Sequence, residues 1–290
     1  MPLDCALGMG GIGKTSLVAE WVEGLIRSGA EPFEAIFWRS LQYNPSLDTL
    51  TQSLSEPVQL LTALQQRRSL LILDHWETLL GGSSAGKVKP EFDDFSALFQ
   101  QLGTTKHSSC VVIISREKPA ELALIDGMNP LIQSLKLEGL GHDAIALLTY
   151  RGLREETAAW QTLIQLYRGH PLALNMIASL IQDVCQGSTT AFLNMNTIVV
   201  HQLDHVLAER IQWLSSTELD VLQTLAQANQ PVSREWLQAT LDSVSGSQLL
   251  EILLSLERRC LLEILSEETV RFALAPIVQK YVGQQILSRL

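Results

Sequence analysis

The octapeptide GMGGIGKT, residues 8–15, matches the pattern G-x-x-x-x-G-K-[ST] and carries two further glycines. Glycines have no side chain, so several backbone N–H groups can converge on phosphate oxygens in a concave nest. Lys14 would place a positive charge on the β- and γ-phosphates of a nucleotide, and the Thr15 hydroxyl could ligate Mg²⁺. An apolar strand before the loop and an amphipathic helix after it supply the context that the motif requires. The sequence therefore predicts binding of ADP or ATP with Mg²⁺ by Gly8, Met9, Gly10, Gly11, Ile12, Gly13, Lys14, Thr15 and Ser16.

The first 138 residues alternate short apolar strands with amphipathic helices, a pattern that is typical of a parallel sheet with crossover helices. We expect an α/β fold, namely a P-loop NTPase sheet with helices on both faces. The expected strands are residues 4–7, 35–38, 70–73, 110–114 and 131–137. The expected helices are residues 14–27, 46–68 with a break at Pro57, and 92–102, and residues 81–90 should form a surface loop.

Beyond Gly139 the pattern becomes helical, with helix-period segments at residues 142–150, 155–167 and 171–182. The last ninety residues predict four helices, then a β-hairpin and a final helix after Pro276. The hairpin strands are expected at 258–264 and 270–274, with the turn at Ser266-Glu267-Glu268. We therefore expect three domains: a P-loop nucleotide-binding domain (1–138), a small helical domain (139–200) and a winged-helix domain (201–290).

Composition limits the classes of partner. The formal charge of −10 and the pI near 5.1 argue against a surface that attracts nucleic acid or anionic lipid as a whole. No apolar run approaches the roughly 18–20 residues of a membrane span, and the N-terminus lacks the features of a signal peptide. The four cysteines lie far apart, which predicts buried thiols in a reducing compartment. The sequence thus predicts a soluble, cytoplasmic protein with no membrane partner.

Two strand ends carry further candidate residues. Asp74 follows the apolar run at residues 70–73 and could provide the second protein contact of Mg²⁺. Glu77 is the nearby carboxylate that could polarise a water molecule, although a solvated loop glutamate fits the pattern equally well. His75 stands where many ATPases have a second acid, and a structural histidine is the favoured interpretation. Arg116 follows the strand at 110–114 and could sense a γ-phosphate at the carboxyl edge of the sheet, or form a surface salt bridge.

Four segments in order, GMGGIGKTSL (8–17), LLILDHWE (70–77), VVIISREKP (111–119) and GHPLALNMIA (169–178), resemble the NB-ARC nucleotide switch ATPases of the STAND class. The likeness is strongest to cyanobacterial signalling proteins of that class. It implies a nucleotide domain, a small helical (ARC1-like) domain and a winged helix that close over ADP. Exchange for ATP would open the protein and permit oligomerisation in signalling or defence. The resemblance also implies that Asp74 orders Mg²⁺, that Arg116 senses the γ-phosphate and that Pro171 packs near the nucleotide.

Three departures from the family pattern matter. His75 replaces a second acid, so hydrolysis by Lys14, Asp74, Glu77 and Arg116 is expected to be slow. Ala275 stands where family members usually place a polar residue, often a histidine, that contacts the β-phosphate of ADP. The segment that contacts adenine in the family would lie upstream of the strand at 4–7. We therefore expect the switch core of a longer or shortened protein, acting with effector or sensor domains in cis or in trans.

Three other functions remain open. A DNA-binding regulator would use the winged helix, but residues 233–241 offer only Arg234, and Arg258-Arg259 are interpreted as a solvated face. A turnover ATPase coupled to mechanical work would favour an acid in place of His75. A scaffold without nucleotide is opposed by the intact phosphate loop. A nucleotide-dependent switch is the leading hypothesis.

Overall fold

The computed structural model describes residues 3–29, 32–43, 46, 60–81, 85–104, 107–125, 132–195, 207–208, 211–266 and 269–287. The chain divides into two compact units. The first comprises Met1–Gly8 and Lys14–Leu137, and the second comprises Met9–Gly13 and Glu138–Leu290. The boundary therefore crosses the phosphate loop. The middle of the loop belongs to the second unit, and both of its ends belong to the first.

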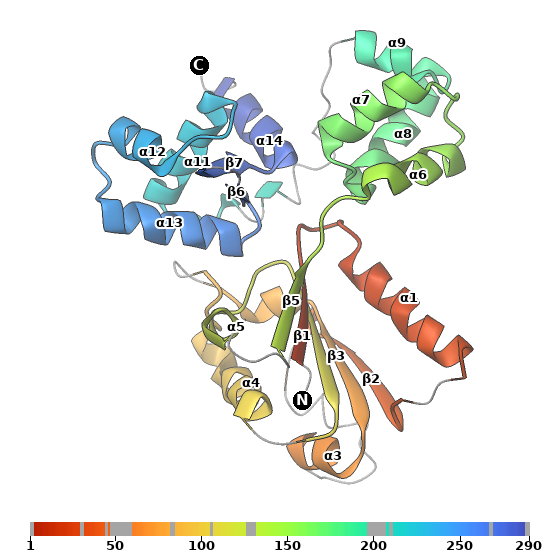
Figure 1. Ribbon diagram of the computed structural model, residues 1–290, viewed down its shortest axis with the longest axis vertical. Coiled ribbons are helices and arrows are strands. Elements are labelled where there is room, and N and C mark those ends of the chain that lie inside the picture. The colour runs from red at the N-terminus through yellow and green to blue at the C-terminus, as the bar shows by residue number, and fades with distance from the viewer. Residues whose placement is uncertain are drawn as a thin grey trace. The chain divides into compact units, whose positions relative to one another are not determined.

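The first unit is built on a five-stranded parallel sheet in the order β2-β3-β4-β1-β5 (Figure 1). Its strands are β1 (Leu3–Leu7), β2 (Ala35–Ser40), β3 (Ser69–Asp74), β4 (Cys110–Ser115) and β5 (Ile132–Lys136). Every residue of β3 and β4 is buried. Strands that are covered on both faces need continuous apolar runs, which is why the sequence revealed these two clearly.

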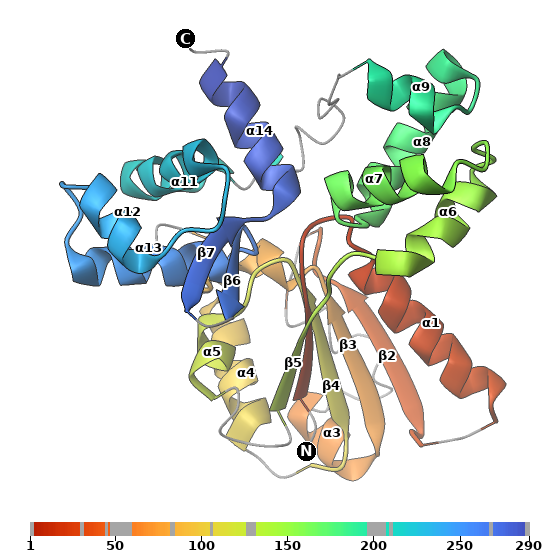
Figure 2. The ribbon, with the colours of Figure 1, turned by 45° about the horizontal axis from the view of Figure 1, so that its top comes forward.

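Helices cover both faces of this sheet, as expected. On one face α1 (Lys14–Arg27) packs Val18 and Val22 against alternate strand residues, including Ile72 of β3. The other face is covered by α3 (Leu60–Gln66), α4 (Asp93–Thr104) and α5 (Ala120–Ile125). These helices pack against the strand residues that point to that face, including Leu73 of β3. Figure 2 shows α1 on one side of the strands and α4 with α5 on the other. Successive side chains of a strand point to opposite faces, so the sheet separates two apolar cores.

Two expectations for the first unit need comment. The helix expected at 46–68 is seen as α3, whereas residues 47–59, with Pro57, lie outside the described residues. The expectation of a surface loop at 81–90 is wrong for Ala85 and Gly86, which are buried. Gly86 has φ +80°, and a Cβ there would lie 2.5 Å from the carbonyl oxygen of Lys118. Close backbone packing therefore buries this glycine, which composition alone had placed in solvent.

The second unit contains helices and one antiparallel hairpin around a single core. The helices are α6 (Ala144–Tyr150), α7 (Thr157–Tyr167), α8 (Pro171–Cys185), α9 (Thr189–Asn194), α11 (Ser216–Ala228), α12 (Arg234–Thr240), α13 (Gly246–Arg258) and α14 (Pro276–Leu287). The hairpin strands are β6 (Leu262–Ser266) and β7 (Val270–Leu274). Capping boxes at Ser215 and Ser245 fix the starts of α11 and α13.

The hairpin is confirmed, but its start was predicted too early. Arg258 ends α13 instead of opening a strand, and Cys260, with φ +55°, separates that helix from β6. Arg259 is 7% exposed, so the interpretation of Arg258-Arg259 as a solvated face is wrong for this residue. The predicted turn residues Glu267 and Glu268 lie outside the described residues.

Two predictions from composition can be compared directly with the structure. All four cysteines are free and buried, as expected: Cys5, Cys110, Cys185 and Cys260. Within the described part of the chain, no helix is both long enough and apolar enough to span a bilayer.

Candidate functional site

The loop after β1 has the backbone that its glycines were expected to provide. Gly8, Gly11 and Gly13 have φ values of +148°, +79° and +103°, which side chains of L-residues rarely allow. The strand before the loop lies inside the sheet, with β4 on one side and β5 on the other. The loop therefore leaves the carboxyl edge of the sheet at its interior, where ligands bind in open α/β sheets.

Lys14 and Ser16 lie in the first turn of α1, where helical N–H groups have no intrahelical partner. Lys14 is buried, and its Nζ donates a hydrogen bond to the carbonyl oxygen of Gly8 at 2.9 Å. The ammonium group thus turns back over the start of the loop. Its charge and the helix N-terminus both favour an anion at this position.

Thr15 and Asp74 meet at the edge of the sheet although 59 positions separate them. Thr15 Oγ1 lies 3.3 Å from Oδ1 of Asp74, whose side chain is almost fully buried. The same carboxylate oxygen accepts the backbone N–H of His75 at 2.9 Å. A hydroxyl and a carboxylate are hard oxygen ligands, and Mg²⁺ commonly takes one or two of these together with phosphate oxygens and water. The two residues therefore fit a Mg²⁺ ion that a nucleotide would help to hold.

A dedicated protein cage for a metal is not seen in the described residues, which contain no group of three or more His, Cys, Asp or Glu side chains able to hold an ion. Thr15 and Asp74 offer two protein oxygens, and a Mg²⁺ ion held by them would take its other ligands from phosphate and water.

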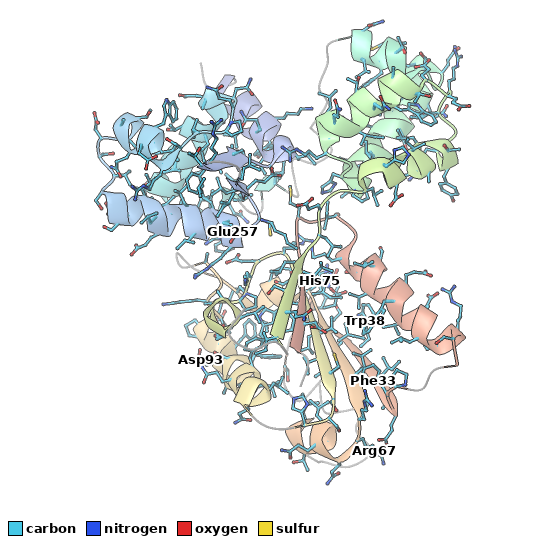
Figure 3. All side chains as sticks on the ribbon, viewed as in Figure 1. Phe33, Trp38, Arg67, His75, Asp93 and Glu257 are labelled. Carbon is cyan, nitrogen blue, oxygen red and sulfur yellow. The ribbon has the colours of Figure 1, made fainter. Side chains whose placement is uncertain are left out.

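His75 follows Asp74 in a left-handed conformation, with φ +62°. Its Nδ1 lies 3.4 Å from Oδ1 of Asp74 and 3.4 Å from the hydroxyl of Ser40, the last residue of β2. Figure 3 labels His75 just beyond the end of β3, opposite Arg67, which precedes that strand. These contacts fit the structural histidine that was favoured from the sequence. Ser40 was not expected here, because nothing near it in the sequence marks it.

Glu77 and Arg116 form an ion pair. Nε of Arg116 lies 2.9 Å from Oε1 of Glu77, and the backbone N–H of Arg116 donates to Oε2 at 3.1 Å. The buried ring of Trp76, packed against Phe95 and Phe99, anchors the short 3₁₀ helix Trp76–Leu79 that carries the glutamate. The structure therefore brings together two of the candidate catalytic residues. Glu77 is not a solvated loop residue, and Arg116 makes the salt bridge that was the alternative expectation.

The middle of the phosphate loop contacts the start of α8 within the second unit. His170 Nε2 lies 3.1 Å from the carbonyl oxygen of Gly10, and the N–H of Leu172 donates to the carbonyl of Gly11 at 3.3 Å. A Cβ at Gly11 would lie 2.5 Å from Cδ2 of Leu172. Sequence reasoning selected Pro171, and the structure places both of its neighbours on the loop.

His170 is thus a candidate functional residue that sequence reasoning treated only as part of a helix start. It is the N-cap of α8, and its Nδ1 accepts the N–H of Ala173 at 3.3 Å. A histidine immediately before a proline at the first helical position was the available signal. That pattern indicates a cap, but it does not reveal what the other ring nitrogen contacts.

Comparisons with solved structures bear on the fold. No protein-family model matches the chain. A WD repeat-containing protein of Nostoc sp. is 32% identical over 98% of the chain, and the chain spans 24% of the length of that relative. Among solved structures, a Walker-type ATPase of Pyrococcus abyssi superposes with a TM-score of 0.60 at 14% identity, covering 97% of this chain and 91% of that one. The ORC2 protein of Aeropyrum pernix, in ADPNP–ADP complexes, gives 0.54 at 15% identity over 99% and 89%. The chain therefore has a P-loop NTPase fold.

Proposed function

We propose that the chain binds ADP or ATP with Mg²⁺ through residues 8–16 and acts as a nucleotide-controlled switch of a signalling or defence protein. The observation that carries this proposal is the approach of Thr15 Oγ1 to within 3.3 Å of Asp74 Oδ1, beside Lys14 and the glycine loop. A hydroxyl and a buried carboxylate at the carboxyl edge of a P-loop sheet are what a Mg²⁺–nucleotide complex requires. A solved structure of similar fold was determined with ADPNP and ADP.

The domain arrangement of this proposal is that of NB-ARC proteins: residues 1–138, 139–200 and 201–290. For a winged helix at 201–290 the support is the order of α11, α12 and α13 followed by the β6–β7 hairpin. An antiparallel bridge joins Val232, between α11 and α12, to Phe272 of the hairpin. A short strand at this position would complete the small sheet of a winged helix.

Slow hydrolysis is part of the proposal. A glutamate that polarises the attacking water needs a free carboxylate, whereas both oxygens of Glu77 are engaged by Arg116. Release of Glu77 would require Arg116 to turn toward another anion, and a γ-phosphate is such an anion. His75 adds no second acid at the end of β3. These features favour a timer that hydrolyses ATP slowly over a motor that turns it over rapidly.

The alternative of a nucleotide-responsive DNA-binding regulator has less support. The solvent-facing side of α13, the third helix of the proposed winged helix, carries Leu250 and Leu254, which are 43% and 52% exposed, with Glu251. Leucines and an acid do not bind phosphates, and Arg259 at the end of this helix is buried. A protein surface is the better partner for such a face.

The relative from Nostoc sp. suggests further partners. The matched region is 24% of that relative, whose printed name states that it contains WD repeats. We propose that the switch works with a sensor or effector domain, in cis or in trans, that it self-associates in the ATP state, and that it acts in the cytoplasm.

Calorimetric titration of the purified chain with ADP and with ATP, each with Mg²⁺, tests the proposal. Lys14→Ala should lower the affinity at least about tenfold, since it removes a charged contact to phosphate. Lys87→Ala, which removes an exposed lysine of the same unit, is the matched control and should leave the affinity unchanged. The proposal is refuted if the wild-type chain gives no binding heat and no nucleotide can be extracted from it.

A further inference from the structure

The turn between α7 and α8, with the adjoining helix ends (residues 166–172), has two separate sets of contacts. On one side His170 and Leu172 reach carbonyl groups of the phosphate loop. On the other side Nζ of Lys280, on α14, donates to the carbonyl oxygen of Leu166 at 2.9 Å. The turn therefore joins two parts of the second unit that are far apart in the sequence.

Lys280 holds the end of α7 by more than one interaction. Its Nζ lies 4.6 Å from the centre of the Tyr167 ring, which is buried. A cation over an aromatic face and at a helix C-terminus is favourable on both counts. Burial lowers the pKa of Lys280 to about 8 and raises the pKa of Tyr167 to about 12. The adjacent Arg168 adds an ion pair to Glu263 of β6, at 3.0 Å, although the arginine is more than half exposed.

The turn itself is stiff. Arg168 and Gly169 both have left-handed backbones, with φ +47° and +64°, and the N–H of Gly169 donates to the carbonyl of Ile164 at 2.9 Å, which closes the end of α7. The carbonyl of Gly169 accepts the N–H of Leu140 at 2.9 Å. A Cβ on Gly139 would lie only 1.7 Å from the carbonyl oxygen of Arg168. The backbone of the turn is therefore closely packed against Gly139 and Leu140.

On the loop side, the contact sets the direction of a phosphate-binding group. Nδ1 of His170 accepts a hydrogen bond, and its Nε2 faces a carbonyl, so the ring is neutral with the proton on Nε2. In a trans peptide the C=O and the following N–H point in opposite directions. By holding the carbonyl of Gly10, His170 therefore turns the N–H of Gly11 away from α8. Leu172 fixes the next peptide of the loop in the same way.

We propose that residues 166–172 form a relay that couples the phosphate loop to the C-terminal helices, with His170 positioning the loop and Lys280 holding the far end. The relay rests on the proposed nucleotide binding. It adds a route by which bound nucleotide would affect the C-terminal helices. Thermodynamic reciprocity makes such a coupling mutual: a nucleotide that tightens the Lys280 end is bound less well when that end is loosened.

Substitutions at two neighbouring positions of α14 distinguish an effect on the relay from a general loss of stability. Lys280→Met keeps the apolar stem over Tyr167 but loses the bond to Leu166. Gln279→Met is the matched control, because Gln279 Nε2 donates to the carbonyl of Ala226, which belongs to α11 and not to the turn. Each variant thus loses one side-chain bond to a backbone carbonyl from adjacent positions of the same helix.

The measurement is the affinity of the full chain for ADP with Mg²⁺ by titration calorimetry. Lys280→Met should weaken binding about five- to fiftyfold, and Gln279→Met by less than twofold. His170→Phe should also weaken binding, and adding Lys280→Met to it should have little further effect, since both act through one turn. In the wild-type chain, ADP should slow labelling of Lys280 by an amine-reactive reagent, as followed by mass spectrometry.

The outcomes are distinguishable. If wild type binds ADP and Lys280→Met binds it equally well, or if the two substitutions are additive, the relay is wrong and nucleotide binding stands. If the wild-type chain itself binds no ADP, the proposed function fails and the relay fails with it. If circular dichroism shows that Lys280→Met is unfolded, Arg168→Gln, at a more exposed position, takes its place. That variant should weaken binding about two- to fivefold, and an unchanged affinity would overturn the relay.

Discussion

Arg116 holds both carboxylate oxygens of Glu77, one with its guanidinium Nε at 2.9 Å and the other with its backbone N–H at 3.1 Å. In a bound ATP complex the γ-phosphate would compete with Glu77 for the guanidinium group. The carboxylate of Glu77 would then be available to polarise a water molecule. Under the proposed function, the pair would link detection of the γ-phosphate to its removal.

Replacement of Arg116 tests this link through the difference between two nucleotides. Arg116→Ala should weaken ATP binding about tenfold or more but ADP binding by less than about twofold, since only ATP carries the γ-phosphate. Paired calorimetric titrations give the ratio. Arg27→Ala, at an exposed arginine at the end of α1, is the control and should change neither affinity. Equal losses for ADP and ATP would show that Arg116 does not sense the γ-phosphate.

Glu77→Gln should separate hydrolysis from binding. The amide keeps the shape of the carboxylate but cannot accept a proton, so steady-state phosphate release should fall about a hundredfold. ATP affinity should stay within about threefold of the wild type. Unchanged phosphate release in Glu77→Gln would remove Glu77 from the catalytic residues.

Asp74→Asn should act through magnesium. The substitution removes the negative charge that faces Thr15 and keeps an oxygen there, so it should reduce the gain in ATP affinity that Mg²⁺ provides. Calorimetric titrations with ATP, once with Mg²⁺ and once with EDTA in its place, give the gain in ATP affinity for the wild type and for the variant. A gain as large in Asp74→Asn as in the wild type would contradict the assignment of Asp74 to the metal.

Two glycine substitutions should have opposite effects on stability. Gly139→Ala should destabilise the chain by about 1–3 kcal/mol or more, because the new Cβ would meet the backbone oxygen of Arg168. Gly24→Ala, inside α1 with no heavy atom within 4 Å of the new Cβ, should stabilise it by about 0.5–1 kcal/mol. Chemical unfolding of both variants measures the difference. A neutral Gly139→Ala would mean that the close packing of this glycine against the α7–α8 turn can relax at little cost.

Lys280 should leave a signature in the dependence of stability on pH. Burial lowers its pKa to about 8 from the ordinary 10.5, so between these values the unfolded chain binds more protons than the folded one. The contribution of Lys280 to the free energy of unfolding should therefore rise from about pH 8 to pH 10.5. The neutral amine can still donate to Leu166. Lys280→Met should show a smaller rise over this window, as measured by denaturant titration at each pH.

The sequence predicts well those features that local chemistry dictates. The phosphate loop needs glycines wherever φ is positive, and the buried strands β3 and β4 need unbroken apolar runs. Asp74 was found because it ends such a run. The prediction failed where a close tertiary contact decides the outcome, as at Gly86, which is buried by the backbone near Lys118.

Contacts between distant segments could not be predicted from local patterns. His170 reaches the carbonyl of Gly10 across 160 positions, and the sequence showed only that it precedes a helix. The pairing of Glu77 with Arg116 likewise depends on β3 lying beside β4. Arg259 was placed in solvent because two adjacent arginines are usually exposed, whereas the end of α13 turns this one inward.

The place of β1 between β4 and β5 has a consequence for how the protein is made. Leu3 of β1 pairs with Val111 on one side and Ile132 on the other. Neither partner exists until more than a hundred further residues have been translated. The first strand must therefore wait on the ribosome for its neighbours, and such non-local pairing is slow to form. Gly8 follows this strand directly, so the start of the phosphate loop is fixed only after β1 has found its neighbours.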